Sequence, residues 1–335
     1  MKKMLLLGLV TASMVSCSNN EVFEVNEVKS RSINFESFVN KPTRADVELT
    51  SLKEFYVFGY YGTNTTVFDN VSVVRSQTNS TTGSWTVGEE EVWDTQNYYF
   101  AAYANGNGDG TSEVDDEDKL TNVDFAGQVL TISNYDTDGT KDLVATKTAI
   151  NRNNTTNFNQ SNVDLTFSHL LSRIAITFKN TSTSAFSVDI SDIELTVKNG
   201  ATYTTDNEWD LNSGAASKVY NITNVTLAQN ASSSETVFYL TPQQLANTET
   251  ISFKAIFKDG AGNPVVVDGG NEYTIILNKG KNSSDSNVAE WKLGVAYNYT
   301  INLPSTPMTI NFNVSKVESW GTATGITISG RDDRN

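Results

Sequence analysis

Few side chains in this sequence are of the types that perform nucleophilic or metal-assisted chemistry. The 335 residues include one histidine, His169, and one cysteine, Cys17. A zinc site built from histidine and cysteine needs more of these residues, and Cys17 ends a leader-like segment, so a catalytic Cys–His pair is also excluded. His169 lies in the apolar run 165–176, where a packed imidazole is the favoured role.

Motifs for the common hydrolytic and phosphate-binding sites are missing as well. The chain holds no GxSxG, HExxH or phosphate-loop pattern. Its 39 aspartates and glutamates would allow a carboxylate pair that hydrolyses glycosides, but no spacing favours one pair over another. We therefore predict a protein that is not an enzyme and needs no cofactor.

One loop carries oxygen-bearing side chains at positions that partly match a calcium loop. They are Asn105, Asn107, Asp109 and, at the twelfth place, Asp116. A helix-flanked calcium loop begins with aspartate and ends with glutamate, whereas this segment follows a predicted strand. We favour an acidic, solvated loop and keep calcium binding by these four residues as the alternative.

The tryptophans are the other candidates for ligand recognition, because indole rings can form a stacking platform for glycans. In β proteins, tryptophans more often fill cores or cover sheet edges, and we favour that role here. Glycan binding by a surface protein remains the alternative. The chain has five of them: Trp85, Trp93, Trp209, Trp291 and Trp320.

Length, composition and charge limit the class of protein. At 335 residues and 36.7 kDa the chain exceeds the size at which single cores stop growing, about 250 to 300 residues, so two domains are expected. A hydrophobic content of 38% is typical of a folded, globular chain. The net charge is −15 and lysine and arginine are not clustered, which excludes nucleic acid as a partner.

From about residue 47 onward, short strands and turns dominate the pattern. The runs 55–61, 71–75, 97–104 and 129–133 are rich in β-branched and aromatic residues, and Gly, Asn, Ser and Thr separate them. More than ten such runs, about 8 to 12 residues apart, predict an all-β protein of antiparallel sandwiches or barrels. The polar stretch 151–162 is the predicted linker, which gives two sandwich domains, 46–162 and 163–335.

The first sixteen residues have the pattern of an export signal. Lys2 and Lys3 precede a short apolar run, and small residues precede Cys17. The apolar run is far shorter than the roughly 20 residues of a membrane span. The residues before Cys17 resemble the lipobox of bacterial lipoproteins, which would make Cys17 the lipid-bearing residue. The alternative is an ordinary signal peptide with a chance cysteine.

Two segments at opposite ends of the chain show similar alternation. Near the start, Ile33, Phe35 and Val39 share one face of a predicted strand. Near the end, the large apolar side chains that share one face are Met308, Ile310, Phe312 and Val314.

A basic loop follows the early strand and suggests that this strand is removable. Pro42 stiffens the loop, and the Arg44–Ala45 bond is the predicted cleavage point. Cutting there would free the early strand and leave an apolar groove, which the late strand of a neighbouring molecule could enter by strand addition. Donor and acceptor surfaces differ, so this contact would build a filament. The alternation leaves a second interpretation open, in which both strands are permanent parts of their own domain.

The order of the segments resembles the fimbrillin-like (Mfa-like) proteins of type V pili. The resemblance rests on the lipobox-like Cys17, a strand followed by TRA, then LKEFYVFGYYG, WTVGEEEVWDTQNYYFAAYA, DLVAT, LTFSHLLSRIAITFKN and a closing YNYTINL with a late VESW. It covers nearly the whole chain from Cys17 to Trp320. It implies a fold of two transthyretin-like antiparallel β-sandwich domains in tandem.

The resemblance also implies a life cycle. The precursor, with signal peptide 1–16 and propeptide 17–45, would be lipidated on Cys17 and carried to the outer membrane. An arginine-specific protease would cut between Arg44 and Ala45, and the subunits would join other fimbrial subunits by donor-strand exchange into an adhesive cell-surface fimbria. The departing strand would be residues 33–39, and the donor strand would lie in the tail 308–328. The alternative within this resemblance is a surface lipoprotein that binds glycans without polymerising.

Overall fold

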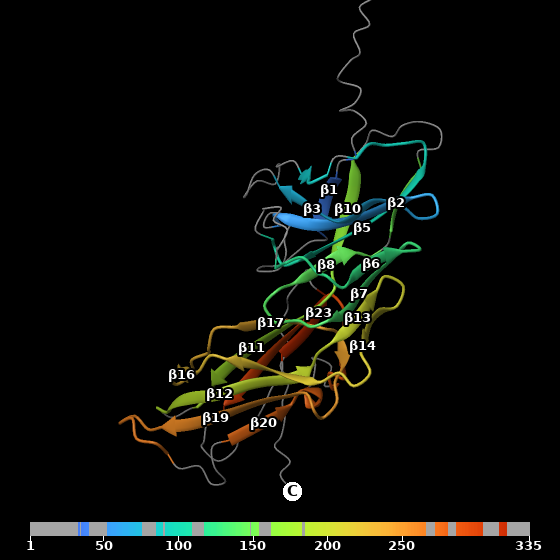
Figure 1. Ribbon diagram of the computed structural model, residues 1–335. Coiled ribbons are helices and arrows are strands. Elements are labelled where there is room, and N and C mark those ends of the chain that lie inside the picture. The colour runs from blue at the N-terminus through green and yellow to red at the C-terminus, as the bar shows by residue number, and fades with distance from the viewer. Residues whose placement is uncertain are drawn as a thin grey trace, which may run out of the picture.

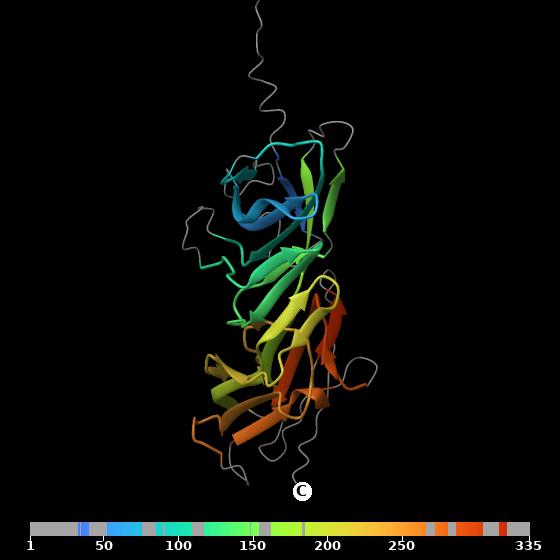
Figure 2. The same cartoon turned by 45° about the vertical axis from the view of Figure 1, so that its right-hand side comes forward.

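The protein is built from strands, as the sequence predicts. The computed structural model describes residues 33, 35–39, 52–75, 85–89, 91–108, 117–147, 149–153, 162–182, 185–265, 272–280, 286–303 and 315–319. These residues form strands β1 to β23 and one short 3-10 helix, η1 (Leu277–Lys279). The molecule is elongated, with its blue and cyan strands at one end and most of its orange and red strands toward the other (Figures 1 and 2).

The strands at the blue end form an eight-stranded sheet, which we call the first sheet. Its order is β1 (Phe35–Val39), β10 (Val163–His169), β8 (Leu143–Thr146), β5 (Asn97–Asn105), β2 (Glu54–Tyr61), β3 (Thr65–Arg75) and β4 (Trp85–Val87), with β9 (Ile150–Asn153) paired to β5 off this path.

A four-stranded sheet, the bridging sheet, lies between the first sheet and the rest of the molecule (Figure 1). Its order is β14 (Glu208–Leu211), β13 (Ala201–Thr204), β7 (Val129–Tyr135) and β6 (Val123–Ala126). It therefore pairs strands from both sides of the predicted linker.

The remaining strands form two larger sheets and a small one. One sheet has the order β17 (Thr236–Leu240), β11 (Ser172–Asn180), β22 (Val295–Leu303) and β23 (Ser315–Ser319). The other has the order β15 (Ser217–Ile222), β12 (Ser187–Lys198), β19 (Thr250–Lys258) and β20 (Glu272–Ile276), with β16 (Val225–Leu227) paired to β12. The small sheet pairs β18 (Gln243–Gln244) with β21 (Glu290–Trp291).

The two larger sheets enclose one core and form a β-sandwich. Ile174 and Phe178 of β11 pack with Leu195 of β12 and Phe253 of β19 in a single buried cluster. The first sheet, by contrast, has two buried faces. Alternate residues of its central strands enter two different clusters, because successive side chains of a strand point to opposite faces.

The double burial explains the unbroken apolar runs of β2 and β5. In β2, Phe55 and Val57 face one cluster, while Tyr56 and Phe58 face the other, which also holds side chains of the bridging sheet. A strand that is buried on both faces has no polar face, so its sequence does not alternate.

Strand β10 follows the predicted linker but belongs to the sheet formed by the strands before it. This strand begins at the predicted boundary, Val163, yet it pairs with β1 and β8 in the first sheet. The two-domain division stays a prediction, and the pairing of β10 favours a boundary after His169 rather than before Val163.

Most strand pairs are antiparallel, but two are parallel. β1 runs parallel to β10, and β11 runs parallel to β22. Parallel neighbours need long connections, and more than 100 residues separate the strands of each pair. Local alternation predicts a strand but does not predict the direction of such a distant partner.

Gly59 in β2 lies where two aromatic rings leave no room for a side chain. A Cβ at this position would be 2.8 Å from Cδ1 of Phe100 and 3.1 Å from Cδ2 of Phe68. We expect Gly59→Ala to lower the free energy of unfolding by about 1–3 kcal/mol through overpacking. Gly88→Ala is the matched control, because its Cβ would meet only the Ser72 carbonyl, at 3.6 Å. Denaturant unfolding checks the pair, and equal stabilities would contradict the crowding argument.

Candidate functional site

The predicted removable strand, β1, lies at an edge of the first sheet. It pairs with β10 in a parallel register that matches Phe35 with Val163 and Val39 with Phe167. Just before β1, the backbone N–H of Ile33 donates to the carbonyl of Glu91, at 2.8 Å. The segment is thus held by main-chain bonds on both sides, although only β10 pairs along its length.

The side chains at the start of this segment belong to the core. Ile33 and Phe35 are 3% and 2% exposed. The Phe35 ring packs edge-on against three other phenylalanines, with centroids 5.5 Å from Phe68, 5.8 Å from Phe100 and 6.3 Å from Phe55. Edge-to-face packing adds about 0.5–1.5 kcal/mol per aromatic pair to the burial term.

Removal of β1 would therefore open a groove with a chemically defined floor. Its aromatic lining would be the three rings that Phe35 now contacts, and its polar wall would be the main chain of β10. An extended segment with alternating apolar side chains fits such a groove, because the main chain supplies hydrogen bonds and alternate side chains fill the pocket.

Several predicted site residues lie outside the described residues. These are the lipidation candidate Cys17, the cleavage pair Arg44 and Ala45, and the donor-strand residues Met308, Ile310, Phe312 and Val314. For Val39, the pairing of its backbone is described and its side chain is not.

The segment directly after the predicted donor strand is an edge strand. β23 pairs antiparallel with β22, matching Ser319 with Val295 and Val317 with Tyr297, and it ends the sheet order. The predicted donor residues are thus continuous in sequence with one edge of the sandwich, whereas β1 lies at an edge of the first sheet. β23 and β1 therefore belong to different sheets.

His169 has the packed role that its apolar surroundings predict. Its side chain is 5% exposed, and its Nδ1 lies 2.7 Å from Oδ2 of Asp142, which is itself buried. The pair joins the end of β10 to the residue before β8, two neighbouring strands of the first sheet.

Three of the described tryptophans are packed, and two of the four, Trp209 and Trp291, line a surface cleft. Trp93 and Trp291 are 0% and 2% exposed, and Trp85 packs on Phe55 with a centroid distance of 4.8 Å. Trp209 is half-buried and lies against Tyr135 and Tyr203. Trp320 lies outside the described residues.

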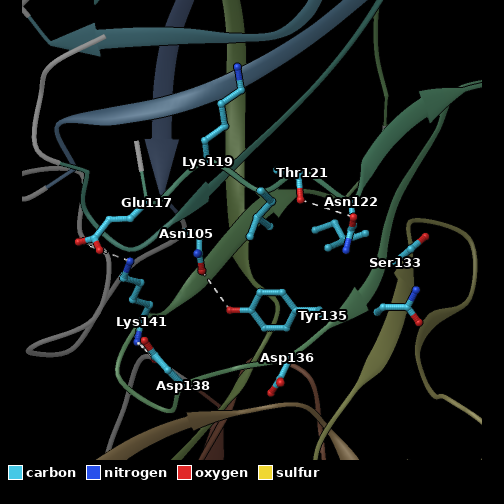
Figure 3. A pocket seen from close by; sticks show the side chains of 13 residues that line it. Asn105, Glu117, Lys119, Thr121, Asn122, Ser133, Tyr135, Asp136, Asp138 and Lys141 are labelled. Atoms are coloured by element: carbon cyan, nitrogen blue, oxygen red, sulfur yellow. Dashed lines mark hydrogen bonds and ion pairs between the residues drawn. The ribbon is translucent and has the colours of Figure 1, made fainter. Parts of the chain in front are cut away.

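Asn105, the first of the four calcium-ligand candidates, lines a cavity of about 320 Å³ beside the bridging sheet, shown in Figure 3. The side-chain Oδ1 of Asn105 accepts a hydrogen bond from the Tyr135 hydroxyl, at 3.0 Å. Burial, with the nearby charge of Asp142 as a second cause, raises the pKa of Tyr135. Lys141 extends its ammonium to Asp118 at 2.6 Å, and Glu117 is 4.0 Å away.

For calcium, these contacts leave the prediction open. The backbone carbonyl of Asn107 accepts from the Lys53 N–H at 2.7 Å, while Asp109 and Asp116 lie outside the described residues. Within the described ranges, no group of three or more His, Cys, Asp or Glu side chains is placed to hold a metal ion. No helix in those ranges combines the length and apolar character of a membrane span.

Sequence patterns miss two features, the three phenylalanines that surround Phe35 and the bridging sheet. Phe55, Phe68 and Phe100 read only as members of apolar strands, and nothing local pairs them with Phe35. The unbroken apolar runs of β2 and β5 are the one available signal, because they indicate strands with two covered faces.

The chain is similar to several solved structures. The chain is similar to a protein from Bacteroides uniformis assigned to cell adhesion, with 19% identity over 86% of this chain and 99% of that chain and a TM-score of 0.50. It is also similar to the fimbrilin FimA from Porphyromonas gingivalis, with 13% identity over 88% and 98% and a TM-score of 0.45. The fimbrial anchor protein Mfa2 from the same organism matches with 10% identity over 90% and 99% and a TM-score of 0.38.

Sequence comparison gives the family directly. The comparison with curated proteins found no match for this chain. The model of the fimbrillin-like family, however, matches residues 43–320, which is most of the 335 residues. The chain therefore belongs to the fimbrillin-like family.

Proposed function

We propose that this chain is a structural or adhesive subunit of a cell-surface fimbria, assembled by donor-strand exchange. Membership of the fimbrillin-like family supports the fimbrial or adhesin role. The observation that carries the exchange step is the position of β1, an edge strand whose Phe35, together with the preceding Ile33, is part of the core of the first sheet.

The energetics of the exchange follow from that position. Loss of β1 would return two core side chains to water, which costs about 1.5–3 kcal/mol for each. It would also leave β10 without a partner at the five register positions on the side that β1 now occupies. Residues 308–314 of a second molecule, with four large apolar side chains on one face, match this vacancy in length and in alternation.

The processing steps are proposed from the sequence. The precursor is lipidated on Cys17 and reaches the outer membrane, an arginine-specific protease cuts the Arg44–Ala45 bond, and the strand 33–39 leaves. Two transthyretin-like sandwiches in tandem, with no catalytic role, then form the fibre subunit. Acceptor and donor lie on different surfaces of one molecule, so the contact propagates along a filament.

A comparison of two chain lengths tests the proposal. A chain that begins at Ala45 lacks β1, and we expect it to form multimers and, as a monomer, to melt at a lower temperature than the chain that begins at Ser18. Size-exclusion chromatography with light scattering and a thermal melt measure both effects.

The control for this test is Phe312→Asp in the chain that begins at Ala45. A buried, unpaired carboxylate would be costly in a neighbour's groove, so this variant should stay monomeric. If the chain that begins at Ala45 stays monomeric at high concentration and melts like the longer chain, donor-strand exchange is rejected. A surface lipoprotein that does not polymerise would then be the better description.

A further inference from the structure

A cleft of about 650 Å³ opens beside β14, at the edge of the bridging sheet. Its walls come from β14, from the β18–β21 pair and from the residues just after β21. Volumes of about 300–1,000 Å³ are typical of small-ligand sites. Strand β14, which lines the cleft, lies near the middle of the elongated molecule and away from β1 (Figure 1).

Two tryptophans line the cleft, and Trp209 is the more exposed one, because Trp291 is buried. The Trp209 indole N–H donates to the carbonyl of Leu170. Its ring lies 5.6 Å from that of Tyr135 and 5.4 Å from that of Tyr203. The side chain is only half-buried, so part of the indole remains available at the cleft. A ring fixed in this way loses little conformational entropy when a ligand stacks on it.

The opposite wall presents an oriented carboxylate. Glu290 Oε1 pairs with Lys292 Nζ at 2.9 Å, and Oε2 accepts from Gln244 Nε2 at 2.6 Å. The bond from Lys292 and then that from Gln244 hold the pKa of Glu290 below its usual range. Each carboxylate oxygen has two lone pairs, so both can accept a further hydrogen bond.

Gln243, beside this wall, has a buried side-chain oxygen without a hydrogen-bond donor among the described residues. The side chain is 6% exposed, and its Nε2 donates to the carbonyls of Lys198 and Thr241. Its Oε1 accepts no hydrogen bond from the part of the chain that the structure describes. A buried carbonyl without a donor is costly, but this oxygen is itself buried, so a ligand in the cleft does not reach it directly.

These groups together specify the chemistry of a ligand. It must offer an apolar face to an indole and several hydroxyls that both donate and accept, which is the chemistry of a pyranose ring. The charged side chains of the lining are Glu208, Asp210 and Glu290 against Lys147 and Lys292, an excess of one negative charge that disfavours sialylated or sulfated sugars.

A peptide strand is the competing occupant, because β14 ends the order of its sheet. Two features argue against it. β14 has only four residues, and two of them, Glu208 and Asp210, are exposed acids. Short length and charge are the devices by which sheet edges resist strand addition.

We propose that this cleft binds a neutral glycan, with a pyranose ring stacked on Trp209 and its hydroxyls bonded to Glu290 and to the Gln244 amide. The proposal goes beyond fibre assembly and does not rest on it. It gives each subunit an adhesive contact of its own, whether or not the subunit polymerises.

The test uses the chain that begins at Ser18, which retains β1 and needs no assembly. The probes are an array of neutral and sialylated oligosaccharides, followed by calorimetric titration with the strongest neutral binder. We expect neutral glycans to bind in preference to sialylated ones. Glu290→Gln and Gln244→Ala should each weaken that binding about tenfold or more, since hydrogen bonds to charged groups contribute about 1.5–3 kcal/mol.

Glu272→Gln is the matched control, because Glu272 is also an exposed glutamate paired with a lysine, Lys254. It should leave glycan affinity unchanged. Glycan binding that is unaffected by Glu290→Gln, or no binding to any neutral glycan at millimolar concentration, overturns the proposal. Binding of a synthetic peptide of residues 308–314, weakened by Glu290→Gln, would instead assign the cleft to strand docking and equally overturn it.

Discussion

Replacing Phe35 with alanine is expected to lower the free energy of unfolding of the chain that begins at Ser18 by about 3–5 kcal/mol. This is the range for removing a fully buried phenylalanine, because the lost transfer energy adds to the cost of the cavity that remains. Phe35 is 2% exposed and contacts three aromatic rings that cannot all close around a vacancy. Denaturant unfolding followed by circular dichroism measures the change.

The matched control is Val92→Ala, at a side chain that is 48% exposed. Surface truncations of this kind usually change stability by less than about 0.5 kcal/mol. A loss below about 1 kcal/mol for Phe35→Ala would show that β1 contributes little to the core. The strand could then leave without creating the groove on which the proposed exchange depends.

The Phe35 experiment also separates two interpretations that the sequence leaves open. Phe35→Ala removes one side chain of this segment, whereas the chain that begins at Ala45 lacks the whole segment. If β1 is a removable part of the precursor, the shorter chain as a monomer should therefore lose more free energy of unfolding than Phe35→Ala does in the long chain. A neighbour's strand should then restore stability in proportion to concentration, because binding to the folded state stabilises it by mass action. If β1 is permanent, no such concentration dependence arises.

Alternation was enough to predict part of the core of the first sheet. Ile33 and Phe35 are spaced for one face of a strand, and both are buried. The parallel partner of that strand was out of reach, because β10 follows it by more than 120 residues and no local pattern encodes such a pairing. The class of fold depended on short-range signals, whereas the order of strands depends on closure of the whole chain.

The same distinction applies to the candidate ligand sites. The sequence favours a packing role for the tryptophans, and tertiary structure bears this out for Trp93 and Trp291, whereas it leaves Trp209 half-buried at a cleft that Trp291 also lines. The carboxylate of Glu290 gains its orientation from Gln244, on a strand 46 residues away. The sequence contains the residue type that can stack on sugars, but nothing local distinguishes one tryptophan from another.

The second large effect is expected at Asn199, which ties the bridging sheet to the sandwich. Asn199 follows β12 of the sandwich, and its amide donates to the Thr137 carbonyl at 2.9 Å, to the Tyr220 hydroxyl at 3.1 Å and to the Asp136 carboxylate. Its carbonyl accepts from the Thr137 N–H at 3.3 Å and from the Gly200 N–H at 3.0 Å. The side chain is 7% exposed, so water cannot readily replace these partners.

We expect Asn199→Leu to lower the free energy of unfolding by about 3–5 kcal/mol, because the two N–H donors and the carbonyl acceptor of the side chain make at least four hydrogen bonds, each worth about 0.5–1.5 kcal/mol. Asn224→Ala is the control, since the exposed Asn224 accepts one bond, from the Asp192 N–H, and should cost about 1 kcal/mol or less. Hydrogen exchange gives a local readout, in which the Thr137 amide should lose protection in the Asn199 variant and keep it in the control. If the Asn199 variant keeps both its free energy of unfolding and the protection of the Thr137 amide, other contacts hold this junction, such as the hydrogen bond from the Tyr220 hydroxyl to the Thr137 carbonyl.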